Sequence, residues 1–186
     1  MKKIFIISAP SGTGKTTIAL RLKEELQNIY IPVTYTTKKP RTEEVEGKDY
    51  RFVSQETFSL MIKKNKFLEW AKVYGNYYGT PKDEILLNIK KGNIIVMTID
   101  TQGGLSIKKL FPESVLIGLL PPSVAEQEKR IRGRSKLAEK DIKERINATK
   151  EERKILFSKY DFRLINKNSE DTLKKIINII TKGKKI

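Results

Sequence analysis

Apolar residues follow two alternating patterns along the chain. Short continuous apolar runs are typical of strands buried on both faces of a parallel sheet, and apolar residues spaced three or four apart are typical of helices. The strand-like segments are 4–7, 30–37, 67–74, 93–99, 114–120 and 162–165. The helix-like segments are 18–26, 54–62, 81–91, 102–110, 123–131, 142–156 and 169–180. This alternation predicts an α/β fold, with a parallel sheet covered by helices on both faces.

Local residue choices predict where two of these helices begin. Thr80 is followed by Pro81, which suits the first helical position, so we expect the Thr80 hydroxyl to cap the helix that follows. Ser123 and Glu126 have the spacing of a capping box, in which each side chain bonds to the backbone of the other. Both signals place a helix directly after a strand-like segment.

Two stretches interrupt the alternation. Residues 38–51 are polar and basic and contain proline and glycine, so they predict a surface loop or a small edge sheet. Residues 132–136 are polar, cationic and contain glycine, which is typical of a flexible lid. We therefore expect one domain with a core of 1–32, 81–131 and 146–186, an inserted lobe of 33–80, and a lid of about 132–145.

The composition limits the chemistry available to the protein. A chain of 186 residues suits one domain with a substantial core. Because the chain has no cysteine and no histidine, disulfides, thiolate metal sites and histidine bases are excluded. No segment approaches the roughly 20 apolar residues of a membrane span, and the N-terminus lacks the apolar core of a signal peptide. We expect a soluble cytoplasmic protein that works with carboxylates, hydroxyls, lysine and arginine.

The net charge of +16 raises the alternative of nucleic-acid binding, because a basic face attracts phosphate. The lysines are spread along the whole chain and mixed with glutamates, and the only arginine-rich segment is a short one near Arg130. This distribution is more typical of solvated surface than of a nucleic-acid interface. Attraction of small anionic substrates is the use of the charge that we expect.

The most specific local motif follows the first strand-like run. Residues 8–17 read Ser-Ala-Pro-Ser-Gly-Thr-Gly-Lys-Thr-Thr and lead into a helix, as a phosphate-binding loop does. Gly12 and Gly14 let backbone N–H groups surround an anion, Lys15 reaches the β and γ phosphates, and the Thr16 hydroxyl holds Mg²⁺. Ala9 stands where the pattern usually has its first glycine. The alternative interpretation is a glycine-rich turn with an incidental lysine.

Further segments give the chain a resemblance to the guanylate kinase family over nearly its whole length. Each stands in the order that this family has. The segments are 34–37 with Pro40 and Arg41, then Glu44, Gly47 and Tyr50, then 67–71, 75–80, 99–103, 120–123, 130–134, Arg145, 160–161 and Asn166. The whole series is much more specific than the phosphate loop alone.

The resemblance implies transfer of the ATP γ-phosphoryl group to GMP or dGMP, giving ADP and the guanosine diphosphate, with Mg²⁺ as cofactor. Glu69 would accept hydrogen bonds from the ring N–H and the amino group of guanine, a donor pair that adenine lacks. The residues implied to bind GMP are Thr34, Lys38, Arg41, Tyr50, Glu69, Tyr78, Thr80 and Asp100. Those implied to bind ATP are Ala9, Pro10, Ser11, Gly12, Thr13, Gly14, Lys15, Thr16, Thr17 and Asn166.

The resemblance also implies which groups are catalytic. Lys15, Arg130, Arg134 and Arg145 would neutralise charge on the transferring phosphoryl group as the lid closes. A solvated basic helix face is the alternative for the three arginines. No histidine is required, because the acceptor is a phosphate oxygen that is already anionic near neutral pH.

Three positions depart from the family pattern, and one of them is Lys167, which stands where the family often has aspartate. Lys38 stands where arginine is usual, and a lysine cannot make the planar two-pronged contact to phosphate, so we expect weaker GMP binding. Thr98 stands where an aspartate is usual, two residues before Asp100, which changes how Mg²⁺ and its waters are organised.

Two other functions are consistent with parts of this sequence. A related binding module could have kept the GMP pocket to recognise phosphorylated peptides, although the intact phosphate loop argues against that. A kinase for another small phosphate acceptor could share the same core. The sequence leaves open whether the protein is a monomer or a homodimer.

Overall fold

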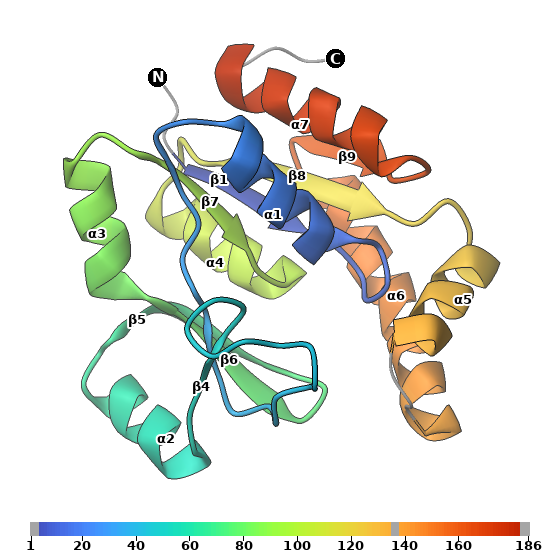
Figure 1. Ribbon diagram of the computed structural model, residues 1–186, viewed down its shortest axis with the longest axis horizontal. Coiled ribbons are helices and arrows are strands. Elements are labelled where there is room, and N and C mark those ends of the chain that lie inside the picture. Colours follow the sequence, from blue (N-terminus) through green and yellow to red (C-terminus); the bar gives the residue numbers. More distant parts are fainter. Residues whose placement is uncertain (1–3, 135–137, 183–186) are drawn as a thin grey trace.

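The structure is a computed structural model that describes residues 4–134 and 138–182, with only the backbone described at Arg134. Within this part of the chain, a central parallel sheet has the strand order β2-β7-β1-β8-β9 (Figure 1). Its strands are β2 (Ile29–Tyr30), β7 (Ile94–Thr98), β1 (Ile4–Ser8), β8 (Val115–Leu120) and β9 (Phe162–Ile165). The α/β class expected from the sequence is confirmed.

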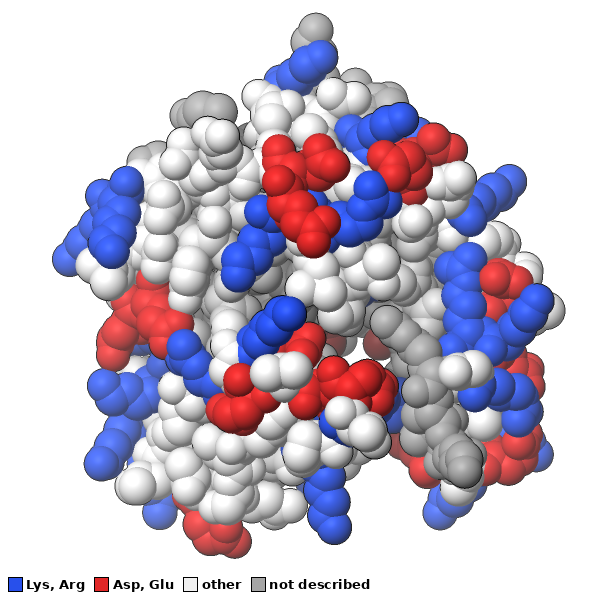
Figure 2. Space-filling model, in the orientation of Figure 1, with Lys and Arg blue, Asp and Glu red and all other residues white. Residues whose placement is uncertain are grey.

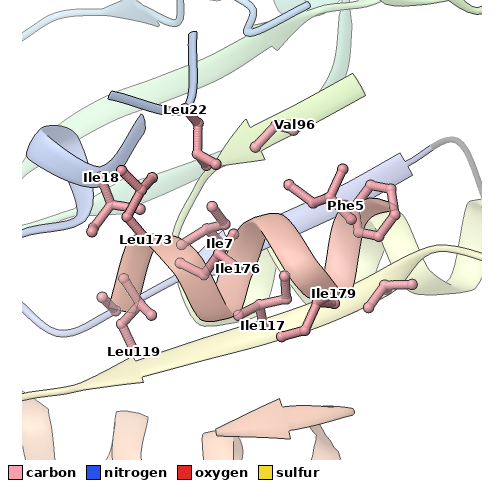
Figure 3. Close-up of a cluster of buried hydrophobic side chains, with 13 residues drawn as sticks. Phe5, Ile7, Ile18, Leu22, Val96, Ile117, Leu119, Leu173, Ile176 and Ile179 are labelled. Atoms are coloured by element: carbon pink, nitrogen blue, oxygen red, sulfur yellow. The ribbon is translucent and has the colours of Figure 1, made fainter. Parts of the chain in front are cut away.

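Helices cover both faces of this sheet because alternate strand residues point to opposite sides. On one face, Phe5 and Ile7 of β1 pack against α1 (Lys15–Glu25) and α7 (Ser169–Lys182) in a single cluster (Figure 3). On the other face, Ile4 and Ile6 pack against α3 (Lys82–Lys90), α4 (Thr101–Leu110) and α6 (Glu139–Lys159). Every residue of β1 is therefore buried, which explains its continuous apolar sequence.

A second sheet lies beside the first and is built from the middle of the chain. Its strand order is β4-β3-β6-β5, with bounds β4 (Arg51–Phe52), β3 (Tyr35–Thr36), β6 (Asn76–Pro81) and β5 (Phe67–Val73). Helix α2 (Gln55–Lys63) packs on it through Phe58, whose ring lies 4.5 Å from that of Phe67 and 5.5 Å from that of Tyr77. These aromatic contacts give the small sheet its own core, separate from the two clusters of the central sheet.

The strand expected at 30–37 is wrong as a single element. The chain leaves the central sheet after β2 and enters the second sheet at β3, so the two ends of this segment pair with different strands. Pro32 lies in the connection, and a proline cannot donate a ladder hydrogen bond. The apolar character of the segment reflects two short strands in two sheets.

The helix start expected at Thr80 is also wrong, and the reason bears on the site. Helix α3 begins at Lys82 with Pro81 as its N-cap residue and has no side-chain cap. Thr80 is still in β6, and its hydroxyl donates a hydrogen bond to the Glu69 carboxylate instead. A side chain that looked like a cap is thus used for a contact between strands.

The segment expected to be a flexible lid is partly helical. Helix α5 (Val124–Arg134) continues through Arg132 and Gly133, and the Ser123 hydroxyl accepts a hydrogen bond from the Glu126 N–H at its start, as the capping box predicts. Arg132 pairs with Glu128 one turn earlier and with Glu139 at the start of α6. These contacts explain why the helix extends further than its composition indicated. Residues 135–137 of the expected lid lie outside the described part of the chain.

None of the helices in the described ranges combines the length and the hydropathy that crossing a membrane requires. On the face shown in Figure 2, lysine and arginine side chains are interspersed with aspartate and glutamate side chains. That face has the mixed charge pattern that the sequence indicated.

The central sheet should depend strongly on the side chains of α7 that cover it. We predict that Ile176→Ala, at a fully buried position, lowers the free energy of unfolding by about 2–5 kcal/mol, because it leaves a cavity against β1. Ile165→Ala, at a position that is 55% exposed, serves as the control and should lower it by less than about 1 kcal/mol. Urea denaturation measures both, and equal losses would contradict this description of the core.

Candidate functional site

The loop between β1 and α1 has the backbone shape of an anion cradle. Gly12 and Gly14 have positive φ values of 78° and 94°, which a residue with a Cβ adopts only with strain. A Cβ at Gly12 would also come within 2.9 Å of the Ile131 side chain. Gly14 is the N-cap residue of α1, so the loop delivers the N–H groups at the start of that helix to the open edge of the sheet.

Buried polar side chains from distant elements hold this loop in place. The Asn166 amide donates to the carbonyl of Thr13 at 2.7 Å, and the Gln127 amide donates to the carbonyl of Ser11 at 2.8 Å. Gln127 also donates to the hydroxyl of Thr149 on α6 at 2.8 Å. The loop is therefore tied to α5, to α6 and to the segment that follows β9.

A cleft of about 1200 Å³ opens at this loop, between the central sheet, the second sheet and α6. Most of the residues that the sequence identifies as candidates share it. Those lining the cleft are Ala9, Pro10, Ser11, Gly12, Thr13, Gly14, Lys15, Thr16, Thr34, Lys38, Arg41, Tyr50, Glu69, Tyr78, Asp100 and Arg145. Thr98 lines it as well.

The other candidates lie elsewhere. Asn166 supports the loop from behind, and Thr80 lies behind Glu69. Arg130 pairs with Glu126 at 2.9 Å and does not line the cleft. Two further candidates complete the set: Thr17 is exposed on α1, and the side chain of Arg134 lies outside the described residues.

Glu69 is a buried carboxylate at one end of the cleft. It is 8% exposed, and one of its oxygens accepts a 2.5 Å hydrogen bond from the Thr80 hydroxyl. The pKa of Glu69 is raised to about 7; burial is the main cause, Asp100 acts in the same direction, and the Thr80 hydrogen bond and Lys15 act to lower it. The second oxygen, Oε2, would lie 2.7 Å from a Cβ at position 103, so Gly103 is required for the carboxylate to occupy this place.

The two carboxylate oxygens of Asp100 have different surroundings. It is the N-cap residue of α4, and its Oδ1 accepts hydrogen bonds from the N–H groups of Gln102 and Gly103 at 2.9 and 3.1 Å. Its Oδ2 lies on the same side of Gly103 as the Glu69 carboxylate. The Glu69 carboxylate on β5 and the Asp100 carboxylate at the start of α4 therefore both lie beside Gly103.

Lys15 is the cation that faces this acidic end of the cleft. Its ammonium group donates to the carbonyl of Ile99 at 3.1 Å. Burial lowers the pKa of Lys15, while Asp100, Glu152 and Glu69, in that order, act to raise it. Three carboxylates thus share one ammonium group.

A second group of side chains lies at the opposite, basic end of the cleft. The Lys38 ammonium bonds both oxygens of the Glu44 carboxylate at 2.5 Å and lies 4.7 Å from the centre of the Tyr50 ring. Glu44 also accepts from the backbone N–H of Arg41 at 2.9 Å. The Tyr50 and Tyr78 rings are 6.1 Å apart, edge to face, and burial raises the pKa of Tyr50 to about 12, so its hydroxyl remains a donor at neutral pH. The group offers ammonium, guanidinium and hydroxyl donors to an anion.

Glu152 and Tyr74 are among the residues that line the cleft and that sequence reasoning missed. Glu152 lies seven residues after Arg145 on α6, so the helical period places both on the same face. That spacing was the signal available in the sequence. Tyr74 lies at the turn of the β5–β6 hairpin, where its chain position alone did not indicate that it faces α6.

The described residues contain no group of three or more acidic or other metal-binding side chains arranged to hold an ion. Thr16 is an exposed hydroxyl at the start of α1 and lines the cleft with Asp100. Mg²⁺ commonly keeps several waters and uses one or two protein ligands together with substrate phosphates. The hydroxyl and the anion cradle therefore fit a magnesium ion that arrives with a phosphate ligand.

Comparison with known proteins gives one consistent result. A family model described as guanylate kinase matches residues 1–183. The guanylate kinase of Caldanaerobacter subterraneus subsp. tengcongensis is 44% identical over 95% of this chain and 85% of its own length. The guanylate kinase of Prochlorococcus marinus (strain MIT 9312) is 43% identical over 96% of this chain and 97% of its own.

A solved structure gives the same result for the fold. The crystal structure of guanylate kinase from Anaplasma phagocytophilum has a TM-score of 0.81 and 30% sequence identity, and the match covers 97% of this chain and 85% of that one.

The Thr80 hydroxyl should control the ionisation of Glu69. We predict that Thr80→Val raises the pKa of Glu69 by about 1 pH unit, because it removes a hydrogen bond to the charged form. A ¹³C NMR titration of the glutamate side-chain carboxyls measures this pKa. Ser54→Ala, which removes a hydroxyl at the start of α2, is the control and should leave it unchanged. A pKa of Glu69 that Thr80→Val does not move would show that the hydrogen bond has no effect on its charge.

Proposed function

The chain belongs to the guanylate kinase family and transfers the γ-phosphoryl group of ATP to GMP, giving ADP and GDP, and we propose how its cleft divides this work. The family and its relatives set aside the alternatives of a binding module and of a kinase for another acceptor. The observation that carries the proposal is the meeting of a buried carboxylate, Glu69, with a phosphate loop in one cleft. The first suits a guanine base and the second a nucleoside triphosphate.

Glu69 selects the base. Guanine presents a ring N–H and an amino group side by side, and one ionised carboxylate accepts from both. Its Oε1 is held by Thr80, and Thr34 and Asp100 line the same cleft beside the base. An adenine base would leave the buried carboxylate without donors, and unpaired buried groups discriminate strongly between substrates.

The basic end of the cleft holds the GMP phosphate. Arg41, Tyr50 and Tyr78 supply a guanidinium and two hydroxyls. Lys38 adds an ammonium group in place of the arginine usual in the family, and this group is already paired with Glu44. A point charge shared with a carboxylate binds phosphate more weakly than a free planar guanidinium does. These contacts involve base and phosphate alone, so dGMP is an acceptor as well.

The loop of residues 9–17 holds the phosphates of ATP, and Thr16 holds Mg²⁺ together with phosphate oxygens and water. The metal ion supplies neutralising charge at the β and γ phosphates. Because Thr98 is not acidic, the hydroxyl of Thr16 carries more of the metal binding than it does where an aspartate stands at that position.

Catalysis consists of alignment and charge neutralisation. The GMP phosphate is already anionic, so no protein base is needed. Lys15 leaves the Ile99 carbonyl to reach the transferring group, and Arg145, which lies 3.3 Å from the Ser11 hydroxyl on the loop, approaches from α6. Arg130 and Arg134 complete the positive charge when the region of 132–145 closes as a lid.

The proposed division of the chain follows from these roles. Residues 33–80 form the GMP-binding lobe, residues 1–32, 81–131 and 146–186 form the core, and about 132–145 form the lid. The second sheet and α2 fall within the lobe, apart from Pro81 at the end of β6. The cytoplasm, which supplies both nucleotides, is the proposed place of the reaction.

We predict that Glu69→Gln raises the KM for GMP by at least about tenfold, because it replaces an ionic acceptor with an amide that can accept from only one of the two guanine donors. The KM for ATP should change by less than about twofold, since the loop holds ATP through its own groups and Glu69 contacts only the guanine base. A coupled assay of ADP formation with ATP, Mg²⁺ and GMP measures both constants.

Glu56→Gln, at an exposed position on α2, is the matched control and should leave both constants unchanged. Equal losses for GMP and ATP would mean that Glu69 is structural. Absence of turnover by the unmodified protein at millimolar GMP would overturn the function itself.

A further inference from the structure

Two of the buried polar atoms that have no hydrogen-bond partner among the described residues lie on opposite walls of the cleft. One is the hydroxyl oxygen of Tyr74, and the other is Oε2 of Glu152. Buried polar groups without partners destabilise a fold, and when they persist they call for an explanation. Both residues line the same cleft, one from the β5–β6 hairpin and one from α6.

The two atoms are chemically complementary. A phenol donates one hydrogen bond, and a carboxylate accepts. They are also electrostatic neighbours: burial is the largest cause that raises the pKa of Tyr74, and the Glu152 carboxylate is the second. Burial likewise raises the pKa of Glu152 to about 7. An approach of the hairpin to α6 that brings the phenol to the carboxylate would satisfy both atoms at once.

Tyr74 occupies a backbone conformation that is unfavourable for a bulky residue. Tyr74 has a φ of 48°, and Gly75 after it has a φ of 79°. A left-handed conformation at a bulky residue costs about 1–2 kcal/mol, so the turn keeps an aromatic residue where glycine or asparagine would be easier. A function for the Tyr74 phenol would explain why this strained conformation is kept.

Tyr74 and Glu152 lie beside the groups that neutralise charge in the reaction. The guanidinium of Arg145 lies 4.9 Å from the centre of the Tyr74 ring, and its Nη1 donates to the Ser11 hydroxyl of the phosphate loop at 3.3 Å. The positive charge of Lys15 acts on Glu152 and lowers the pKa of its carboxyl group, against the effect of burial. One line of contacts therefore joins the proposed GMP lobe, Arg145 and the phosphate loop.

We propose that Tyr74 and Glu152 are positioning residues for phosphoryl transfer: the Tyr74 hydroxyl donates to the Glu152 carboxylate when the lobe with bound GMP approaches α6. This contact fixes Arg145 under the Tyr74 ring and keeps Lys15 beside the transferring group. Neither residue touches the reacting atoms. The inference rests on the proposed function of the cleft, and it assigns to the pair the task of coupling acceptor binding to alignment of the two cations.

The test is a double-mutant cycle with Tyr74→Phe, which removes only the hydroxyl, and Glu152→Leu, which removes the acceptor at similar volume. At pH 8, where Glu152 is ionised, each single variant should lower kcat by about tenfold, the value of one hydrogen bond to a charged group. Both KM values should stay within about threefold, because neither residue contacts a substrate. The double variant should be no slower than the slower single variant.

A second measurement separates a positioning role from a structural one. In the protein without nucleotides, both variants should keep or raise the melting temperature, since each removes a buried unpaired polar atom. The further rise in melting temperature on adding ADP with GMP, a pair that cannot react, should be smaller in both variants than in the unmodified protein. Glu151→Gln, at an exposed position beside Glu152, and Tyr77→Phe, on the same hairpin, are matched controls that should behave as the unmodified protein does.

The opposite results would overturn the inference. They are effects on kcat that multiply in the double variant, an unchanged kcat in either single variant, or a lower melting temperature without nucleotides. Loss of the proposed function itself is distinguishable, because it would appear as absence of GMP turnover by the unmodified protein.

Discussion

Three carboxylates share one ammonium group at the acidic end of the cleft, and the site depends on this imbalance of charge. Lys15 interacts with Asp100, Glu152 and Glu69 in a place where burial weakens the hydration of Lys15 and of the two glutamates. The protein as a whole carries +16, so the acidic cluster is a local feature of the cleft. Burial raises the pKa of both Glu69 and Glu152 to about 7, so both carboxyl groups are partly protonated near pH 7. This cluster of carboxylates is suited to accept hydrogen bonds from guanine and to bind additional cations.

The fold supports the cluster by placing a specific group behind each carboxylate. Thr80 gives its hydroxyl to Glu69, so α3 starts without a side-chain cap. Asp100 caps α4 with one oxygen and leaves the other toward Glu69 across Gly103. The phosphate loop opposite is held by amides of Gln127 and Asn166, which come from far along the chain. Functional sites commonly keep arrangements that lower the stability of the fold.

Much of this could be predicted from the sequence, because β1, β7 and β8 are continuous apolar runs and the phosphate loop has a local signature. The errors arose where tertiary contacts changed a local preference. Thr80 resembled a cap but is needed by a carboxylate eleven residues earlier, and residues 132–134 looked flexible but are helical where Arg132 pairs with Glu128 and Glu139. Tyr74 and Glu152 were not predicted as cleft residues because their places in the cleft depend on how two separate elements are packed. The bond from the Asn166 amide to the carbonyl of Thr13 also depends on tertiary packing, and the family resemblance that assigns Asn166 to ATP did not indicate it.

The central claim is that the buried Glu69 carboxylate selects GMP as the acceptor. The phosphate loop, by contrast, would suit any reaction that uses ATP. The most direct test is kcat/KM for GMP, dGMP, AMP, UMP and CMP, measured with fixed ATP and Mg²⁺. This account predicts that the two guanine nucleotides are used at least about 10³-fold better than the other three, because only guanine supplies both donors to Glu69. Comparable turnover of a nucleotide with any other base would contradict it.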